Sequence, residues 1–139
     1  MRLIDLLEAD EIKWASGQDL NRAIIKYRQK DPDYVVVSAN IRDLFARTWP
    51  SYALDLDDPR GGRNAIGDRV ERARQHWSSG GHMDPSEISI SHEGGEPAVV
   101  WQDGRHRLVA AHRLGHEYGQ VVVPRSDLDD LRKIVRIKD

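Results

Sequence analysis

The chain has 139 residues, of which 39% are apolar and 32% charged, and its net charge is −2 with a pI near 6.3. These values predict one globular domain with an ordinary hydrophobic core, and they exclude an extensive nucleic-acid-binding surface. The lack of cysteine excludes disulfides, thiolate metal sites and a cysteine nucleophile. No apolar run reaches the ~20 residues that span a bilayer, and the first residues lack a signal-peptide core, so we expect a cytoplasmic protein with no membrane partner.

Two helices are predicted before the first strand. Residues 3–14 carry an imperfect apolar stripe at helical spacing. A break at Ser16 and Gly17 precedes a second amphipathic helix. Asp31 and Pro32 end that helix, because the residue before a proline avoids the helical region.

The middle of the chain alternates between a strand, helices and loops. A β-branched run at 34–39 predicts a buried strand, and residues 41–48 predict a short helix. Residues 51–63 are rich in Asp, Pro and Gly and predict a loop. Residues 64–77 place apolar side chains on one face and predict an amphipathic helix, which a second loop at 78–85 follows.

The C-terminal half predicts two strands, a helix, a strand and a final helix, at residues 87–91, 98–102, 105–114, 120–124 and 126–135. Gly115 should end the first of these helices, and Ser126 should cap the second, with Asp129 as its capping-box partner. The whole order predicts a single α/β (α+β) domain, a mixed sheet flanked by helices. We expect a helical extension at 1–33, a core at 34–125 and a C-terminal helix at 126–139.

The segment "DGRHR", residues 103–107, places Arg105, His106 and Arg107 in the first turn of a predicted helix. The helix dipole disfavours cations there by about 0.3–1 kcal/mol each. A strand that enters a helix through Gly104 directs backbone N–H groups into one small volume, which suits a bound phosphate, and the basic side chains could then contact it. Alternatively, both arginines lie in solvent or pair with Asp103.

The stretch "VVWQDGRHRLVAAHRLGHEYGQVVVP" resembles the signature of the ParB/sulfiredoxin superfamily, and the resemblance spans roughly residues 34–125. It implies a small fold that binds a nucleoside triphosphate, with the phosphates at the start of this helix. Gly104, His106 and Arg107 match the phosphate-binding turn, and together with Asp103 they come closest to the version found in free-serine kinases.

Two members of this superfamily fit the sequence poorly. Sulfiredoxins carry a cysteine where this chain has Arg105, so their reductase activity is excluded. Partition proteins add a helix-turn-helix domain and a dimerisation tail, for which we find no segment of sufficient length. Chromosome segregation is therefore not expected, and the fold alone does not decide which reaction remains.

Three further residues are candidate nucleotide contacts. Arg63 follows two glycines that leave the backbone accessible to a phosphate. Ser38 and Asn40 come at the end of a buried strand, where α/β proteins place ligand contacts. Asn40 could equally cap the helix that follows it.

Metal ligands could come from Asp55, Asp57 and Asp58, since Mg²⁺ is usually held by one or two carboxylates plus nucleotide phosphates. An acidic surface loop is the alternative for this segment. His112 and His116 are four residues apart, but Gly115 should break the helix between them, so we do not expect a zinc site.

Two classes of function follow. The first is an enzyme that binds ATP or another nucleoside triphosphate with Mg²⁺ and hydrolyses or transfers a phosphate, or that cuts a phosphodiester in a short nucleic acid. The second is a non-enzymatic nucleotide- or DNA-sensing module. The sequence identifies no general base, and it leaves the nucleotide, the acceptor and the oligomeric state open.

Overall fold

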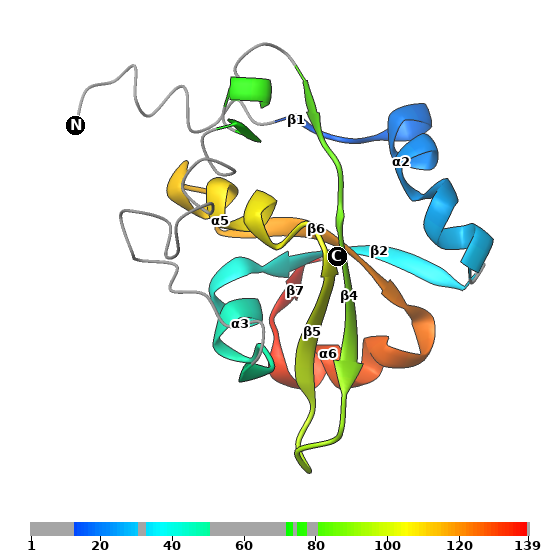
Figure 1. Ribbon diagram of the computed structural model, residues 1–139, viewed down its shortest axis with the longest axis vertical. Coiled ribbons are helices and arrows are strands. Elements are labelled where there is room, and N and C mark those ends of the chain that lie inside the picture. Colours follow the sequence, from blue (N-terminus) through cyan, green and yellow to red (C-terminus); the bar gives the residue numbers. More distant parts are fainter. Residues whose placement is uncertain (1–12, 31–32, 51–71, 74, 78–80, 139) are drawn as a thin grey trace.

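The computed structural model describes residues 13–30, 33–50, 72–73, 75–77 and 81–138 (Figure 1). Within these residues, the central element of the fold is a mixed five-stranded sheet with the strand order β5-β4-β6-β2-β7. Its strands are β2 (Tyr34–Asn40), β4 (Ser86–Ser91), β5 (Ala98–Asp103), β6 (Tyr118–Pro124) and β7 (Ile137–Lys138). β4 and β6 pair in parallel, and the other neighbours pair antiparallel. The predicted mixed α/β domain is confirmed.

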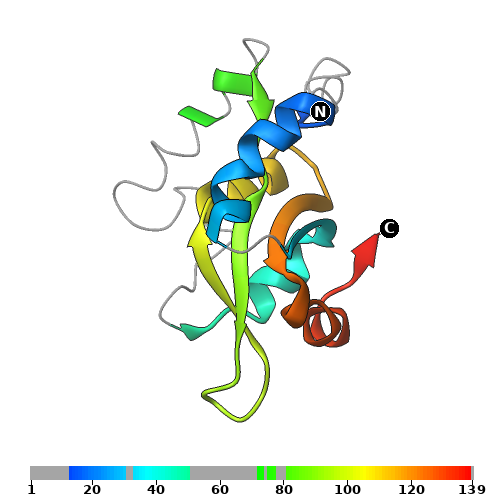
Figure 2. The same ribbon diagram turned by 90° about the vertical axis from the view of Figure 1, so that its right-hand side faces the viewer.

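Helices cover both faces of this sheet (Figures 1 and 2). The helix α2 (Gly17–Lys30) packs Ile24 against Val122 of β6 on one face. The helices α3 (Ile41–Ala46), α5 (Arg105–Arg113) and α6 (Leu128–Ile134) pack on the other face, around the larger core. Alternation along β6 explains the division, because Val121 and Val123 point to the larger core and Val122 points to α2.

Aromatic and aliphatic side chains from the sheet and from the helices fill the larger core. Trp101 of β5 stacks on Phe45 of α3 with ring centroids 4.9 Å apart, and its indole donates a hydrogen bond to Thr48 Oγ1 at 2.9 Å. Trp77, at the end of the helical residues 75–77, is only 6% exposed and belongs to the same core. That burial agrees with the predicted apolar face at Trp77, while residues 64–71 of the predicted helix lie outside the described residues.

Two predictions, the helix at residues 3–14 and the loop at residues 78–85, are wrong in part. Residues 13–14 form a strand, β1 (Lys13–Trp14), rather than the end of a helix, and the predicted loop contains a strand, β3 (His82–Met83). The two strands pair in parallel, and Ala15 N donates to Met83 O at 2.9 Å. Paired strands of two residues each depend on their tertiary surroundings for stability, so no local sequence pattern predicts them.

The C-terminal prediction also needs correction. Residues Arg125–Asp127 form a 3-10 helix before α6, and Ser126 is therefore not the N-cap. Asp127 immediately precedes α6, but its carboxylate accepts a hydrogen bond from Ile90 N of β4 at 3.1 Å and does not cap the helix. Beyond α6, the unpredicted strand β7 pairs with β2.

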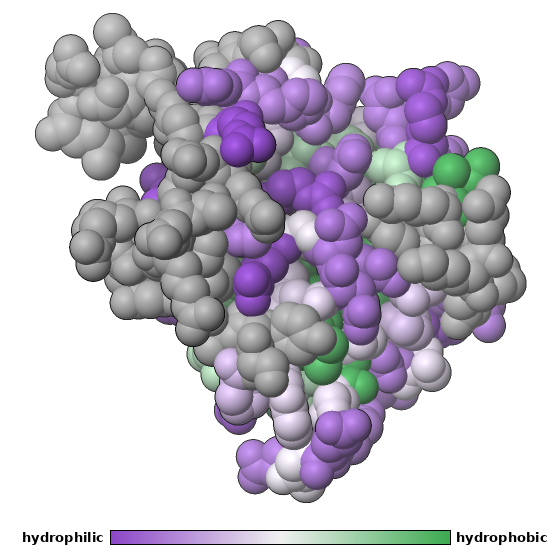
Figure 3. Space-filling model, viewed as in Figure 1, coloured by the Kyte–Doolittle hydropathy of each residue, from purple (hydrophilic) through white to green (hydrophobic). Residues whose placement is uncertain are grey.

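The face of the molecule in Figure 3 is mainly hydrophilic, with hydrophobic atoms in small separate areas. Among the described residues, Ile25 is the large apolar side chain that stands exposed, at 56%. The described helices include none that is long and apolar enough to cross a membrane.

Candidate functional site

The turn that joins β5 to α5 has the predicted geometry. β5 ends at Asp103, Gly104 adopts the left-handed conformation with φ 83°, and α5 begins at Arg105. Only glycine adopts this conformation without steric cost, and it provides no side chain to cap the helix. The predicted strand, glycine and helix are therefore confirmed at residues 103–107, and Gly115 ends the helix in the same conformation with φ 94°.

The side chain of Arg107 folds back over this turn. Its Nη2 lies 3.4 Å from Asp103 Oδ2, and the arginine side chain is 26% exposed against 50% for the aspartate. A Cβ atom at Gly104 would overlap the Arg107 guanidinium and would lie 2.6 Å from Ser86 Oγ. Ser86 in turn donates a hydrogen bond to Gly104 O at 2.8 Å. The glycine thus makes room for the arginine as well as for the turn.

Asp103 resolves the conflict between Arg107 and the helix dipole. The carboxylate precedes the helix, where negative charge is favoured, and it neutralises a cation one turn later. An anion at this turn would have to compete with Asp103 for the Arg107 guanidinium. Arg105 and His106 are half-buried beside it and also take part in polar or ring contacts.

The residue paired with Asp103 in the sheet carries a carboxylate too, but its side chain lies on the α2 face, beside Val122. The β4–β5 register shifts between Glu87 and Ile88, so that Glu87 pairs with Asp103. Glu87 is only 6% exposed, and Tyr34 donates its hydroxyl proton to Glu87 Oε2 at 3.0 Å. Tyr34 therefore partners Glu87 on the α2 face, whereas Arg107 partners Asp103 beside α5.

Sequence reasoning missed Glu87 because the alternation in "SEISIS" assigns it a face of the sheet but no neighbour. Its pairing with Asp103 depends on the register shift, which only the three-dimensional structure reveals. Among the described residues, no group of three His, Asp or Glu side chains converges as a metal site would require.

Ser38 and Asn40 are not brought together with the turn. β2 lies three strands from β5 in the sheet, a separation of ~14 Å at the usual strand spacing. Ser38 instead lines a hollow of about 400 Å³ on the α2 side, with Leu20, Gln120 and Lys138. A phosphate at the turn would not reach either side chain.

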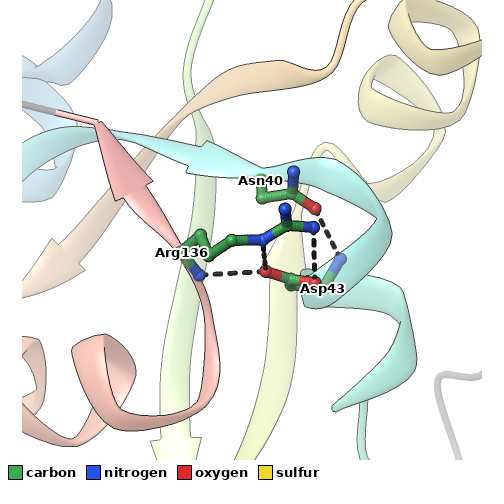
Figure 4. A network of polar contacts seen from close by, with 3 residues as sticks. All are labelled: Asn40, Asp43 and Arg136. Atoms are coloured by element: carbon green, nitrogen blue, oxygen red, sulfur yellow. Dashed lines mark hydrogen bonds and ion pairs between the residues drawn. The ribbon is translucent and has the colours of Figure 1, made fainter.

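Asn40 caps α3, as one of its two sequence interpretations predicts. Its Oδ1 accepts a hydrogen bond from Asp43 N at 2.9 Å (Figure 4). The Asp43 carboxylate accepts three more bonds from Arg136, from the backbone N at 3.0 Å, Nε at 2.8 Å and Nη2 at 3.2 Å. The hydrogen bonds from the Arg136 side chain lower the pKa of Asp43 below its usual range. The hydrogen bond from the Arg136 backbone and the positive charge of Arg136 lower that pKa further.

The remaining candidates fall outside the described residues. These are Arg63 as a phosphate contact and Asp55, Asp57 and Asp58 as metal ligands. Their distance from the turn stays a prediction.

Comparisons with known proteins support the fold class and identify no family. No protein-family model matches the sequence, and no curated protein matches it either. Among solved structures, the chain is similar to the Oncogenic Suppression Activity Protein, described as a plasmid fertility inhibition factor and solved as a gold(I) cyanide derivative, with a TM-score of 0.54 and 16% identity. The match covers 74% of this chain and 57% of that one, so the chain spans well under two thirds of its structural neighbour. The class shown is a small mixed α/β domain.

Proposed function

We propose that residues 103–107 bind the phosphates of ATP or another nucleoside triphosphate, as the resemblance to the ParB/sulfiredoxin superfamily implies. The observation that carries the proposal is the position of the Arg107 guanidinium over Gly104, at the start of α5. A guanidinium can bind two phosphate oxygens at once, and a glycine turn lets those oxygens approach the backbone. Arg107 would exchange Asp103 for phosphate, and His106 would donate a further bond.

The same turn supports a phosphoryl-transfer or hydrolysis reaction. Such reactions depend mainly on positioning and on neutralising the phosphate charge, which Arg107 and His106 could supply. Asp103, once released from Arg107, is the described carboxylate at this turn that could contribute to a Mg²⁺ site. Bound Mg²⁺ would supply further neutralisation of the phosphates. A nucleic-acid phosphodiester held by the same groups is the variant in which the protein is a nuclease.

A second candidate is a non-enzymatic nucleotide- or DNA-sensing module. The Asp103–Arg107 ion pair favours this module. A ligand that displaced Asp103 from Arg107 would change the contacts within the turn, and no chemical reaction would be needed. The structural neighbour is described as a plasmid fertility inhibition factor, which names an inhibitory role for that protein. An inhibitor of this kind would need binding but no turnover.

Calorimetric titration with ATP, CTP, GTP and a short DNA duplex, each with and without Mg²⁺, tests the proposal. Arg107→Ala should weaken nucleotide binding at least tenfold, about 1.4 kcal/mol. Arg107→Lys should recover only part of it, since lysine lacks the planar fork. Arg132→Ala, an exposed arginine on α6, is the matched control. Release of phosphate or cleavage of the DNA in the same samples separates the enzyme from the sensing module.

Stability separates a binding arginine from a structural one. The Asp103–Arg107 pair is partly exposed, so its loss should cost under about 1 kcal/mol and shift the melting temperature by only a few degrees. An Arg107→Ala protein that melts much lower yet binds nucleotide as the parent does would contradict the proposal.

A further inference from the structure

A hollow at the far end of α5 gathers basic side chains from separate elements. It has a volume of about 210 Å³ and lies between the start of α3, the end of α5, the loop before β6 and the residue before β7. Its lining consists of Asn40, Arg42, His112, Gly115, His116, Glu117 and Arg136. α5 has nine residues, so this hollow lies ~13 Å along the helix from the turn at residues 103–107.

The contact between Arg42 and His112 depends on the protonation of the imidazole. Arg42 Nη2 lies 3.4 Å from His112 Nε2, and because an arginine can only donate, a hydrogen bond between them requires an unprotonated Nε2. An imidazolium has a proton on both nitrogens and cannot accept. Protonation of His112 would therefore turn the two side chains into neighbouring donors that face each other across the hollow.

The protonation of the two histidines decides the net formal charge around the hollow. The charged or titratable groups that line it are Arg42 from α3, His112 from α5, His116 and Glu117 from the loop and Arg136 before β7, while Asp43 and Tyr118 lie near Arg136. Asp43 is bound by Arg136 through three hydrogen bonds (Figure 4), and Glu117 matches Arg42 in formal charge. The net charge is thus near zero with neutral imidazoles, and it becomes positive when His112 or His116 takes a proton.

We propose that this hollow is a second binding site, for a small oxyanion such as phosphate or a phosphate monoester, and that it binds its ligand when the histidines are protonated. The hollow is smaller than the roughly 300–1,000 Å³ of pockets for larger ligands, so it suits a single tetrahedral anion and not a whole nucleotide. The Arg42 guanidinium and the His112 imidazolium would each donate to the anion in place of their present contact. A cation is disfavoured because two guanidinium groups line the site.

Sulfate is the best first probe, because it is tetrahedral and keeps its charge of −2 across the pH range in which histidine imidazoles ordinarily titrate. Sulfate titrations followed by amide NMR, at constant ionic strength in chloride, should shift residues 41–42 and 115–117 in a saturable way. The dissociation constant should be at least fivefold lower at pH 5.8 than at pH 7.8. Shifts that grow linearly without saturation, or that do not depend on pH, would overturn the proposal.

Three variants assign the site, and the dispersion of their spectra reports whether each is folded. Arg42→Gln changes an exposed side chain and should weaken sulfate binding at least fivefold at pH 5.8. A double variant, His112→Gln with His116→Gln, should abolish the pH dependence, and a retained pH dependence would exclude the mechanism. Arg107→Ala should leave sulfate binding at residues 41–42 and 115–117 unchanged, whatever it does to nucleotide binding. Failure of this site is thereby distinguishable from failure of the phosphate turn.

Discussion

At the start of α5, Arg107 is bound by a carboxylate four residues before it, whereas at the end of the same helix Arg42 meets an imidazole. The helix dipole explains why the two ends differ. Its positive end disfavours Arg107 unless an anion is near, and Asp103 is that anion. Its negative end favours His112 and Arg113 in the last turn.

The difference shows how each end would respond to a phosphate. At the first end a ligand must displace Asp103, so the competition takes place between two anions for one guanidinium. At the second end the ligand meets the unfavourable end of the dipole, so it needs the extra charge of protonated imidazoles. Under the two proposals, one helix would offer two basic sites with opposite requirements.

The largest expected effect comes from Leu108→Ala, which tests whether both ends depend on one rigid helix. Leu108 is fully buried, and its Cδ2 lies so close to Gly119 of β6 that a Cβ there would overlap it. Truncation should cost about 2–5 kcal/mol through lost burial and a cavity. A thermal melt should show a drop of roughly 8–15 °C, with weaker binding at both sites.

The control for this variant is Ile25→Ala, which removes an exposed side chain from α2 and should change stability by less than about 0.5 kcal/mol. If Leu108→Ala melted within a degree of the parent protein, α5 would not be anchored as the packing indicates.

A smaller effect is expected from Gly104→Ala, with Gly115→Ala as the matched control at the other end of the helix. Both glycines have positive φ, 83° and 94°, so an alanine at either position should cost about 1–2 kcal/mol of strain. At Gly104 the new Cβ would also displace the Arg107 guanidinium. Urea unfolding should show a loss for both variants, the larger for Gly104→Ala because of this overlap, while calorimetry should show weaker nucleotide binding for Gly104→Ala alone. Equal effects on nucleotide binding would break the assignment of the phosphate site to the first end.

The smallest effect is expected from Asp43→Asn, which removes the negative charge and one of the two oxygens that accept the Arg136 hydrogen bonds beside the second end. The pKa of Asp43 is depressed, so its stabilising contribution is present above the usual carboxyl value of about 4 and is lost as the pH falls through the depressed pKa. After allowance for solvent exposure, the variant should lose about 1 kcal/mol at pH 7. Melting curves of the two proteins should converge as the pH falls below the depressed pKa of Asp43. A difference that stayed constant down to pH 2 would contradict the linkage.

Sequence reasoning predicted the parts of the fold that local patterns encode. The β-branched runs identify β2 and β6, and the bracketing glycines identify α5. The cap at Asn40 is one of the two roles that its residue type and position offer, and the hydrogen bond from Asp43 N confirms it. These elements are stabilised by interactions among residues close in the chain or by a continuous apolar face.

The parts that were missed depend on distant segments. β1 and β3 are two residues each and exist because they pair with each other across the chain. Ser126 has the residue type of an N-cap, but the carboxylate next to it, Asp127, is bound to β4 and the chain enters α6 through a 3-10 turn. The hollow at the end of α5 collects side chains from four elements, so no short motif could have indicated it.

The position of β2 has a consequence for the order in which the chain can fold. β2 is formed by residues 34–40, but its two neighbours in the sheet, β6 and β7, come from residues 118–124 and 137–138. Loops this long close slowly, and both edges of an apolar strand stay unpaired until most of the chain has left the ribosome. Nascent chains that stall before residue 118 therefore present an open β-edge to one another, and we expect them to be the aggregation-prone species during synthesis.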